Sequence, residues 1–544
     1  GALTGARSIG EALSSAAILA VLLALFLALR WIAIGGVTAP LDPLTENALR
    51  ALMLIGAGYI ALPRGGDPGQ IARVRGHALM ASGLVIAFFS GALVFNPWWG
   101  EAPALIAGAP LLNTQALALA APGALAAAAS RQLYASHRFA ARSYGGAGAL
   151  FMLLWAVLEI RRAFHGGDMV AAEVGLLEGD CYGLLALGSA LSVAVAAQLR
   201  AVRGPFATDL ARIMRLCAFA GLGLAVLILL GARNPWWGGQ NPALSSDLIT
   251  GLAVFAQAAA AGLALALGRA LCRDKAIDAA RFAAAGSAIL FALSFGHDAI
   301  RWLHHGGAMD DNPDLILGLE GFGHTLWPLA LVLAGAALTG KRDTERAYLH
   351  DLQAIWSAAV WPALVWAALA LWLVFNPWWG IAPAFADTPR AALIGLASLL
   401  LAAWMSAIAA NVTHLPFKSM FERIATIACT GHLFVALSLI VRWLFHGADM
   451  RVSIEGSSLE TWSYSALWAL FGAGVWASGA RRGDSTLRWS GLGVLLLVTG
   501  KVVVFDTATL GGVIRAASVI GLAFVLILVA LAARRFGGAQ GSRE

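Results

Sequence analysis

Stretches of about 20 apolar residues, joined by short polar links, follow one another along the whole chain and limit what it can fold into. By that length there are sixteen, which together take up about two thirds of the 544 residues. Only 12% of the residues are charged, about half the fraction found in a soluble domain. So little charge cannot cover sixteen apolar segments in water. The sequence therefore predicts an all-α polytopic membrane protein with about sixteen transmembrane helices.

Charged residues are divided unevenly between alternate links. Basic groups such as Arg73 with Arg75, and Arg138 with Arg142, fall on one side of the predicted membrane. That side holds 26 Lys and Arg with 11 Asp and Glu, whereas the other holds 11 and 19. Basic loops stay in the cytoplasm, so we expect both termini there. The net charge of +7 thus reflects orientation, and we expect no nucleic-acid partner.

Three motifs recur with a period of about 140 residues. Asn-Pro-Trp-Trp-Gly begins at Asn96, Asn234 and Asn376, Arg-x-x-x-His-Gly begins at Arg161, Arg301 and Arg442, and Leu-Glu ends at Glu178, Glu320 and Glu460. Motifs that share one period indicate internal triplication. Each copy holds four spans, A to D, so all copies have the same orientation and form parallel repeats about an axis along the membrane normal.

The two ends of the chain supply a fourth, split copy. Arg30 and Glu46 keep the spacing of the C and D spans, and Asp506 follows Asn376 by 130 residues, as expected for the end of an A span. A pseudo-fourfold ring would join the two halves. The expected divisions are half repeats at 1–65 and 484–544 around full repeats at 66–203, 204–346 and 347–483.

The last two spans carry a further pattern, made of Lys501-Val502-Val503-Val504-Phe505-Asp506 and then Leu510, Arg515, Ser518 and Gly521. Together with the repeated Arg-x-x-Phe/His-His-Gly segments, it resembles the bacterial domain-of-unknown-function 2339 family of predicted membrane proteins. The resemblance covers most of the chain. It implies a multi-spanning protein of the bacterial inner membrane, so the face opposite the basic links is periplasmic. It implies no activity and no catalytic residues.

The NPWWG motifs fall at the periplasmic ends of the A spans. Proline cannot continue a helix and glycine permits a sharp turn, so the motif ends the span with its indoles at headgroup level. The tryptophans are interpreted either as interfacial anchors or as an aromatic platform that binds a sugar ring or lipid headgroup. These candidate ligand-binding residues are Trp98, Trp99, Trp236, Trp237, Trp378 and Trp379.

In Arg-x-x-x-His the two side chains share one helical face, and each arginine precedes a glutamate by 16 to 19 residues. We expect four structural ion pairs: Arg30 with Glu46, Arg161 with Glu178, Arg301 with Glu320, and Arg442 with Glu460. The first hairpin has Ile34 at the histidine position, so the scaffold does not require a histidine.

The three histidines of this motif are His165, His305 and His446. We interpret them as ligand-binding candidates or as partners of a neighbouring carbonyl or indole. A three-histidine metal site is disfavoured because no second ligand lies on the same helix. We therefore expect no metal and no cofactor.

Some ionisable residues break the repeat at membrane depth, where such groups are costly and mark functional sites. They are Glu159, His297, Asp298, His324, His432 and Lys501. Of these, Glu159, His297 and Asp298 join the ligand-binding candidates. Asp298 is interpreted equally well as a local partner of Arg301 or His297.

Three classes of function follow from these features. The first is a binding or transport protein whose repeats surround a periplasmic cleft for an amphipathic or anionic envelope molecule, with membrane lipids or a lipid-linked glycan as partners. The second is a periplasmic-face enzyme acting on a lipid-linked substrate, with Glu or His as general base. The lack of a nucleophile motif and of a Gly-rich phosphate loop makes it the alternative. The third is a structural hub for envelope proteins.

Overall fold

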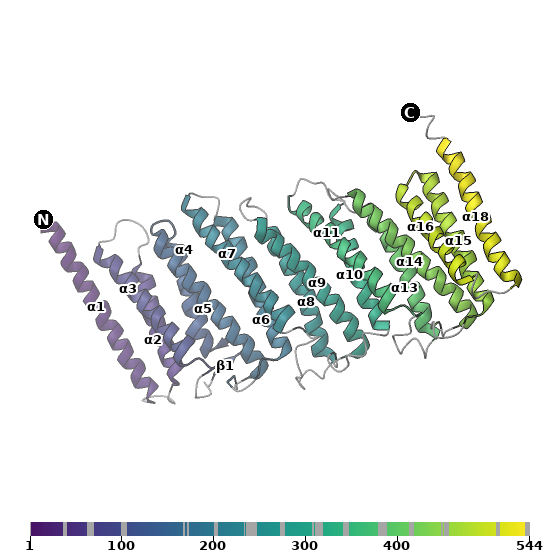
Figure 1. Ribbon diagram of the computed structural model, residues 1–544. Coiled ribbons are helices and arrows are strands. Elements are labelled where there is room, and N and C mark those ends of the chain that lie inside the picture. The colour runs from purple at the N-terminus through teal and green to yellow at the C-terminus, as the bar shows by residue number, and fades with distance from the viewer. Residues whose placement is uncertain are drawn as a thin grey trace. The chain divides into compact units, whose positions relative to one another are not determined.

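Helices account for nearly all of the computed structural model (Figure 1). It describes residues 2–35, 41–62, 70–99, 106–166, 169–170, 173–200, 205–232, 234, 247–271, 278–306, 309, 319–340, 347–378, 389–412, 418–447, 450, 456–506 and 512–538. The α-helices are α1 (Ala2–Ala33), α2 (Pro43–Ala61), α3 (Gln70–Ala87), α4 (Ala121–Leu133), α5 (Arg138–His165), α6 (Leu176–Arg200), α7 (Pro205–Val226), α8 (Asp247–Leu271), α9 (Asp278–His305), α10 (Leu319–Gly340), α11 (Ala347–Leu369), α13 (Pro389–Val412), α14 (Lys418–His446), α15 (Ser458–Arg482), α16 (Ser485–Lys501) and α18 (Gly512–Gly538). The π-helical segments are η1 (Phe88–Val94), η2 (Ala116–Ala120), η3 (Leu227–Ala232), η6 (Ala370–Val374) and η7 (Val502–Asp506). A short antiparallel hairpin pairs β1 (Gly108–Ala109) with β2 (Leu112–Asn113).

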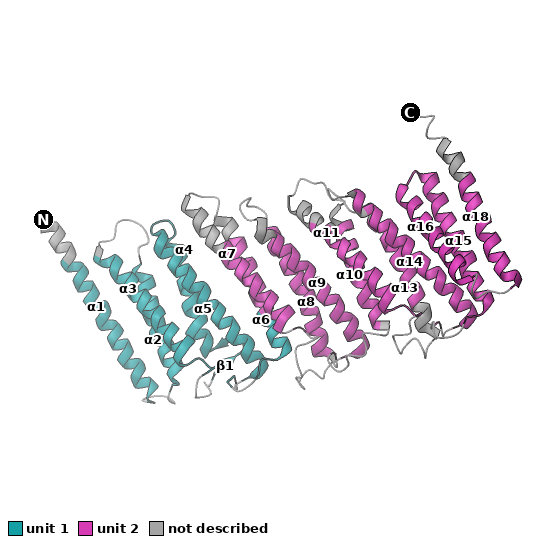
Figure 2. Ribbon diagram, viewed as in Figure 1, with its two compact units in different colours: residues 1–182 teal, residues 183–544 magenta. Residues whose placement is uncertain are grey.

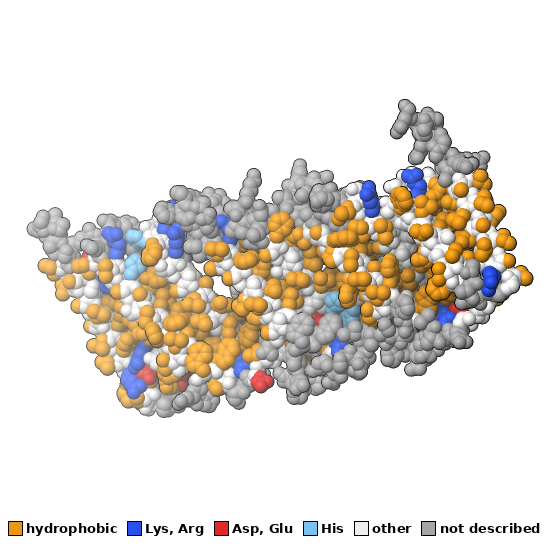
Figure 3. Space-filling model, in the orientation of Figure 1, with side chains coloured by type: hydrophobic (Ala, Val, Ile, Leu, Met, Phe, Trp, Pro, Cys, Tyr) orange, Lys and Arg blue, Asp and Glu red, His pale blue; other side chains and the backbone are white. Residues whose placement is uncertain are grey.

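Ten of the described helices are long and apolar enough to cross a membrane. They are Ile9–Ala33, Ile71–Val94, Arg138–His165, Leu176–Ala196, Arg215–Ala232, Leu248–Leu271, Phe282–His305, Glu422–His446, Ser485–Asp506 and Gly512–Leu531. Large hydrophobic side chains are exposed along them, and in Figure 3 they cover the surface between the helix ends. Such a surface suits lipid. The chain is therefore an all-α, multi-pass membrane protein.

The prediction of sixteen spans goes beyond these ten. Two more apolar helices, Ala358–Val374 and Gly395–Ala409, are shorter than a span. The other predicted spans include α2, α10 and α15, which each carry a glutamate in the first turn. Each of these glutamates contacts an arginine of the preceding helix, as described below. That α2, α10 and α15 cross the membrane stays a prediction, which rests on the repeats.

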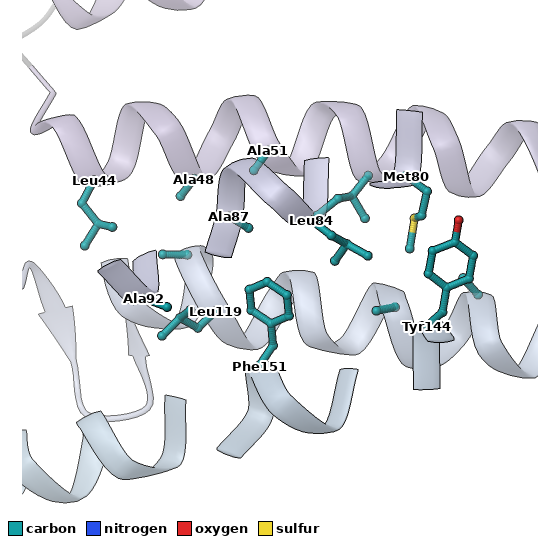
Figure 4. Packing of buried hydrophobic residues seen from close by; sticks show 14 of the residues in the cluster. Leu44, Ala48, Ala51, Met80, Leu84, Ala87, Ala92, Leu119, Tyr144 and Phe151 are labelled. Carbon is teal, nitrogen blue, oxygen red and sulfur yellow. The ribbon is translucent and has the colours of Figure 1, made fainter. Parts of the chain in front are cut away.

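The described residues form two compact units, residues 1–182 and 183–544 (Figure 2). In the first, fully buried Ala48 and Ala51 of α2 pack near Ala87 of α3, while Leu119 of η2 lies beside Phe151 of α5 (Figure 4). Small residues let helices approach closely, which stabilises packing where lipid removes the hydrophobic driving force. The predicted ring closure would join helices of different units and stays a prediction.

The helices that end at an NPWW or related segment share an unusual last turn. The π-helical segments η1, η3, η6 and η7 directly follow α3, α7, α11 and α16. Asn96 closes the first of these ends, because its Nδ2 donates to the Ala92 carbonyl at 2.9 Å and its Oδ1 accepts from the Trp98 amide at 2.9 Å. Asn376 bonds in the same way, to Trp372 and Trp378. Proline at the next position prevents further helix.

Besides α15, which ends at Gly483 (φ 69°), four described helices end at a glycine with a positive φ, a conformation that costs glycine little. The glycines are Gly35 (φ 86°), Gly166 (φ 62°), Gly306 (φ 60°) and Gly447 (φ 64°). Each follows directly on the arginine-containing last turn. The glycine therefore ends the helix where arginine and its neighbour four residues later lie at the edge, facing the start of the next helix.

Close packing of α15 and α16 depends on glycine. A Cβ added to Gly491 would lie 2.4 Å from the backbone nitrogen of Trp476 and 2.7 Å from the carbonyl oxygen of Gly472. We expect Gly491→Val to force the helices apart and lower the free energy of unfolding by about 1–3 kcal/mol. Gly493→Val is the matched control, because no atom lies within 4 Å of its added Cβ. Equal thermal unfolding midpoints of the two purified variants would contradict this packing.

Candidate functional site

A buried polar cluster centres on Arg161 at the end of α5. Arg161 Nη1 donates to Glu178 Oε1 at 3.0 Å, and Nε donates to the Met169 carbonyl at 3.0 Å. His165 Nε2 lies 2.7 Å from Glu178 Oε2, and the Tyr182 hydroxyl donates to Oε1 at 2.7 Å. Arg161 and Glu178 are each 1% exposed. Three donors saturate the carboxylate, which offsets the cost of burying its charge.

The same cluster occurs where α14 meets α15. Arg442 Nη1 donates to Glu460 Oε1 at 2.7 Å, and Arg442 Nε donates to the Met450 carbonyl at 3.4 Å. His446 Nε2 lies 2.7 Å from Glu460 Oε2, and the Tyr464 hydroxyl donates to Oε1 at 3.1 Å. Ser457 caps the helix and accepts from the Glu460 amide at 3.1 Å. The cap holds the glutamate in the first turn, where the helix dipole favours a carboxylate.

At the junction of α9 and α10, histidine replaces the tyrosine of this cluster. Arg301 Nη1 donates to Glu320 Oε1 at 3.3 Å, and its Nε bonds to the Met309 carbonyl. His305 Nε2 lies 2.8 Å from Glu320 Oε2, and His324 Nε2 lies 3.0 Å from Oε1. This glutamate is therefore bonded to two imidazoles and a guanidinium.

The first hairpin keeps only part of the arrangement. Arg30 Nη1 donates to Glu46 Oε2 at 3.0 Å, but the Arg30 side chain is 59% exposed. Arg50, four residues after Glu46, bonds to Oε1. The position four residues after each glutamate thus always contacts the carboxylate. Sequence reasoning missed this position, although a polar residue at i+4 from every glutamate is the signal that could have found it.

The two tryptophans of the first NPWW segment lie in different environments. Trp98 stacks on Tyr182, with ring centroids 6.0 Å apart and an interplanar angle of 22°, and the Arg161 guanidinium carbon lies 5.3 Å from its ring centre. Trp99 is 58% exposed, and its Nε1 donates to the Leu93 carbonyl at 3.0 Å. The first indole is therefore part of the buried cluster, and the second is free to meet lipid or a ligand.

The third repeat positions its first tryptophan in the same way. Trp378 stacks on Tyr464, with centroids 5.7 Å apart and an angle of 26°. Trp236, Trp237 and Trp379 lie outside the described residues. A tryptophan, a tyrosine, a glutamate, an arginine and a histidine thus recur as one cluster in repeats one and three.

Glu159, a ligand-binding candidate, holds the β-hairpin against α5. Its Oε1 accepts from the Leu111 amide at 2.7 Å, and its Oε2 accepts from Asn113 Nδ2 at 2.9 Å. Arg162 donates from Nη2 to the Gly108 carbonyl at 2.7 Å. Both oxygens of the Glu159 carboxylate therefore stabilise the conformation of this hairpin.

His297 and Asp298, neighbours in sequence, belong to different networks. His297 lies in α9, one turn before Arg301. Its Nδ1 lies 2.9 Å from His324 Nδ1. Asp298 is fully buried, and its Oδ2 accepts from Ser294 Oγ at 3.0 Å. Ser294 Oγ in turn accepts from Asn234 Nδ2 at 2.7 Å. The structure therefore links His297 to the Glu320 cluster and Asp298 to the end of η3.

A buried ion pair of another kind, between a lysine and an aspartate, lies where η7 meets α15 and α18. Lys501 Nζ donates to Asp506 Oδ1 at 2.7 Å and to Ser465 Oγ at 2.6 Å. Asp506 Oδ2 accepts from Ser465 Oγ at 2.6 Å and from the Ser518 hydroxyl. Asp506 is 0% exposed. Both serines also line a mostly apolar cavity of about 220 Å³. The Lys501, Asp506 and Ser518 pattern of the sequence is thus one cluster in space, which Ser465 completes.

The model of a family of predicted membrane proteins, DUF2339, matches residues 207–536, more than half of the chain. The chain belongs to the DUF2339 family. The matched part contains the Glu320 and Glu460 clusters and the Lys501–Asp506 pair. No curated protein and no solved structure matches the chain.

In this DUF2339 protein the imidazole is more exposed than the arginine and the glutamate that it contacts. The His165, His305 and His446 side chains are 17%, 15% and 16% exposed, whereas the arginines and glutamates are 1–5% exposed. A carboxylate only accepts, so we assign the proton of the 2.7–2.8 Å contact to Nε2. Arg161 Nη1 and Arg442 Nη1 also lie 3.1 Å and 2.9 Å from Nε2 of His165 and His446, but both donate to the glutamates. Nδ1 makes no hydrogen bond within the described part of the chain. It can accept from a hydroxyl or, as imidazolium, donate to an anion.

Metal chemistry has no assembled site in the parts of this DUF2339 protein that the structure describes. Within those ranges, no three His, Cys, Asp or Glu side chains are grouped to hold an ion. The clusters are instead ion pairs whose partners are hydrogen-bonded to one another. Their chemistry is therefore hydrogen bonding and proton exchange at the exposed imidazole edge.

Proposed function

We propose that this protein binds or moves an amphipathic or anionic envelope molecule, a lipid or a lipid-linked glycan, at the periplasmic face of the bacterial inner membrane. The repeated cluster carries the proposal. In each complete copy a buried arginine–glutamate pair fixes one imidazole through Nε2, and its Nδ1 makes no hydrogen bond with the residues that the structure describes. The charges of the arginine and the glutamate largely cancel, so we expect a ligand to contact the exposed edge of the imidazole.

The proposed architecture is sixteen spans in parallel four-helix repeats, three complete and one split between the termini, closed into a pseudo-fourfold ring. The recurring helix ends support it. π-helical turns follow α3, α7, α11 and α16, and left-handed glycines end α1, α5, α9 and α14. Among the described residues, the π-helical turn and the glycine five residues after the arginine of an ion pair each occur once in every expected unit. The basic links support a topology with both termini in the cytoplasm, which would put the clusters at the periplasmic ends.

The chemistry of the exposed groups favours a ligand with hydroxyls and an apolar part. Each Nδ1 offers one hydrogen bond, and Trp99 offers a large amphipathic surface that is 58% exposed. Indoles rest at headgroup level, where glycerol, sugar and phosphate groups of lipids lie. A lipid headgroup or a lipid-linked sugar would satisfy both kinds of contact.

Lipid retention tests this proposal. His165→Ile, His305→Ile and His446→Ile combined copy Ile34 of the first hairpin and leave each arginine–glutamate pair in place. Three lost hydrogen bonds, each worth about 0.5–1.5 kcal/mol, should lower retention of at least one headgroup class about tenfold or more. The measurement is mass spectrometry of the lipids that co-purify with the protein. His304→Ile, an exposed neighbour outside the cluster, is the control, and a lipid profile unchanged by the triple variant would rule the proposal out.

An enzyme acting on a lipid-linked substrate at the same face is the second candidate. The observation that favours it is the Glu–His contact of 2.7–2.8 Å, because a carboxylate that orients an imidazole leaves the other nitrogen as a general base. Turnover of a lipid-linked substrate that is lost in the triple isoleucine variant would support the enzyme. Retention of lipid without turnover would support the binding protein.

A further inference from the structure

The second repeat differs from the other two at the two positions that extend its cluster. His324 stands where the first and third repeats have Tyr182 and Tyr464, four residues after the glutamate. His297 stands four residues before the arginine, where the other repeats have Val157 and Ser438. Histidine at these two positions thus extends the arginine–glutamate–histidine cluster into a longer chain of ionisable groups.

That chain of hydrogen bonds runs from the surface into the helix pair. His305, 15% exposed, contacts Glu320 Oε2 at 2.8 Å, and Glu320 Oε1 contacts His324 Nε2 at 3.0 Å. His324 Nδ1 contacts His297 Nδ1 at 2.9 Å. His324 is 6% exposed. From His305 to His297 the chain spans eight residues of α9, about 12 Å along the helix axis.

We propose that His324, held between Glu320 and His297, is a proton-binding site that loads from the periplasmic end through His305. This inference is independent of the proposed lipid ligand. Both nitrogens of His324 are hydrogen-bonded, and a carboxylate 3.0 Å from Nε2 requires a proton between them. An imidazolium satisfies both contacts, donating from Nε2 to Glu320 and from Nδ1 to His297. The described geometry is that of the loaded site.

Loading adds one proton and moves no electrons. In the unloaded site His324 is neutral, with its proton on Nδ1 and bonded to His297. One proton enters at His305 Nδ1, and His305 gives its Nε2 proton to Glu320 Oε2. The carboxyl group of Glu320 then makes half a turn about its Cγ–Cδ bond, so that the protonated oxygen faces His324 Nε2, gives the proton there and is again a carboxylate. His305 regains a proton on Nε2 and releases that of Nδ1 to water, which restores its starting tautomer. Both transfers between residues follow hydrogen bonds of 3.0 Å or less.

The surrounding charges favour a proton at this place. Glu320 is the partner carboxylate, and Arg301 bonds to its Oε1 at 3.3 Å, whereas Asp298 bonds to Ser294 in a separate network. Among the described charged residues of the packed neighbours, Arg215 of α7 and Arg269 of α8 lie toward the opposite ends of their helices. Glu320 is therefore the carboxylate that an imidazolium at His324 contacts.

Nitrogen NMR of the full chain, labelled with ¹⁵N at histidine and held in lipid nanodiscs, tests the site. We expect one buried imidazole that carries a proton on each ring nitrogen and shows scalar coupling across an N–H···N bond. His324→Tyr, which copies the other repeats, should remove this signal. His297→Ser, which copies Ser438, should keep an imidazolium but lose the coupling. A wild-type protein without a coupled pair of imidazoles would overturn the proposal, whatever the variants do.

Proton exchange tests the route. His305→Gln should slow exchange of the His324 N–H protons with water about tenfold or more, because the bonded path through Glu320 is cut. His446→Gln changes the corresponding histidine of the third repeat and is the matched control, expected to leave this exchange rate unchanged. Equal exchange in both variants would overturn loading through His305.

Discussion

Asp506→Asn is expected to lower the free energy of unfolding by about 3–5 kcal/mol, the cost of leaving one member of a buried ion pair without its partner. Asp506 is 0% exposed and the Lys501 side chain is 15% exposed. Asparagine is the residue that the three repeats have at this position, so its size and backbone preferences suit the end of η7. The loss would therefore report the charge of Lys501 and not a misfit of the new side chain.

Lys501→Leu combined with Asp506→Asn should recover most of this loss. The pair Leu371 and Asn376 occupies these two positions in the third repeat, and apolar groups often replace a buried ion pair without loss of stability. Thermal unfolding of the two single variants and the double variant in one detergent measures the coupling between the residues. Losses that simply add in the double variant would contradict a direct pair.

Glu178→Gln should also lower the free energy of unfolding by about 3–5 kcal/mol. The variant leaves the Arg161 guanidinium, 1% exposed, without a carboxylate, and it removes the acceptor of His165 and Tyr182. Loss of the hydrogen bond from Tyr182 should also weaken the stacking of Trp98 on Tyr182. The measurement is the unfolding midpoint of the purified protein, read together with the fluorescence of its tryptophans.

Glu46→Gln is the matched control for that variant. The pair with Arg30 has the same place in its hairpin, but the Arg30 side chain is 59% exposed and can be solvated without a partner. Exposed ion pairs contribute about 0–1 kcal/mol, so we expect a loss of that size. An equal loss in both variants would show that burial of Arg161 does not determine the cost.

The spacing of residues along the sequence predicted much of the candidate site. Arg161 and Glu178 flank a short turn between two antiparallel helices, so their separation along the chain is enough to place them near one another. Spacing does not reveal that His165 joins the same carboxylate, because that requires the rotation of α5 against α6. Nor does it reveal Tyr182, which the sequence offers only as one aromatic residue among many in the spans.

The tryptophan pairs show the same limit. Sequence places Trp98 and Trp99 together at headgroup level, and both interpretations of the motif treat them alike. In the structure one indole is stacked within the cluster and its neighbour is 58% exposed. Which of the two faces outward depends on the turn that Asn96 closes after η1, and no periodicity applies in such a turn.

Membrane class and family follow from the sequence by itself, and the family match and the apolar helices confirm both. Those properties are local, because apolar length decides whether a segment can cross lipid. Only the tertiary structure decided the networks. His297 and His324 are 27 residues apart and share a hydrogen bond, and Ser465 joins Asp506 across 41 residues. Such contacts depend on how each helix is rotated about its own axis, and packing between helices sets that rotation.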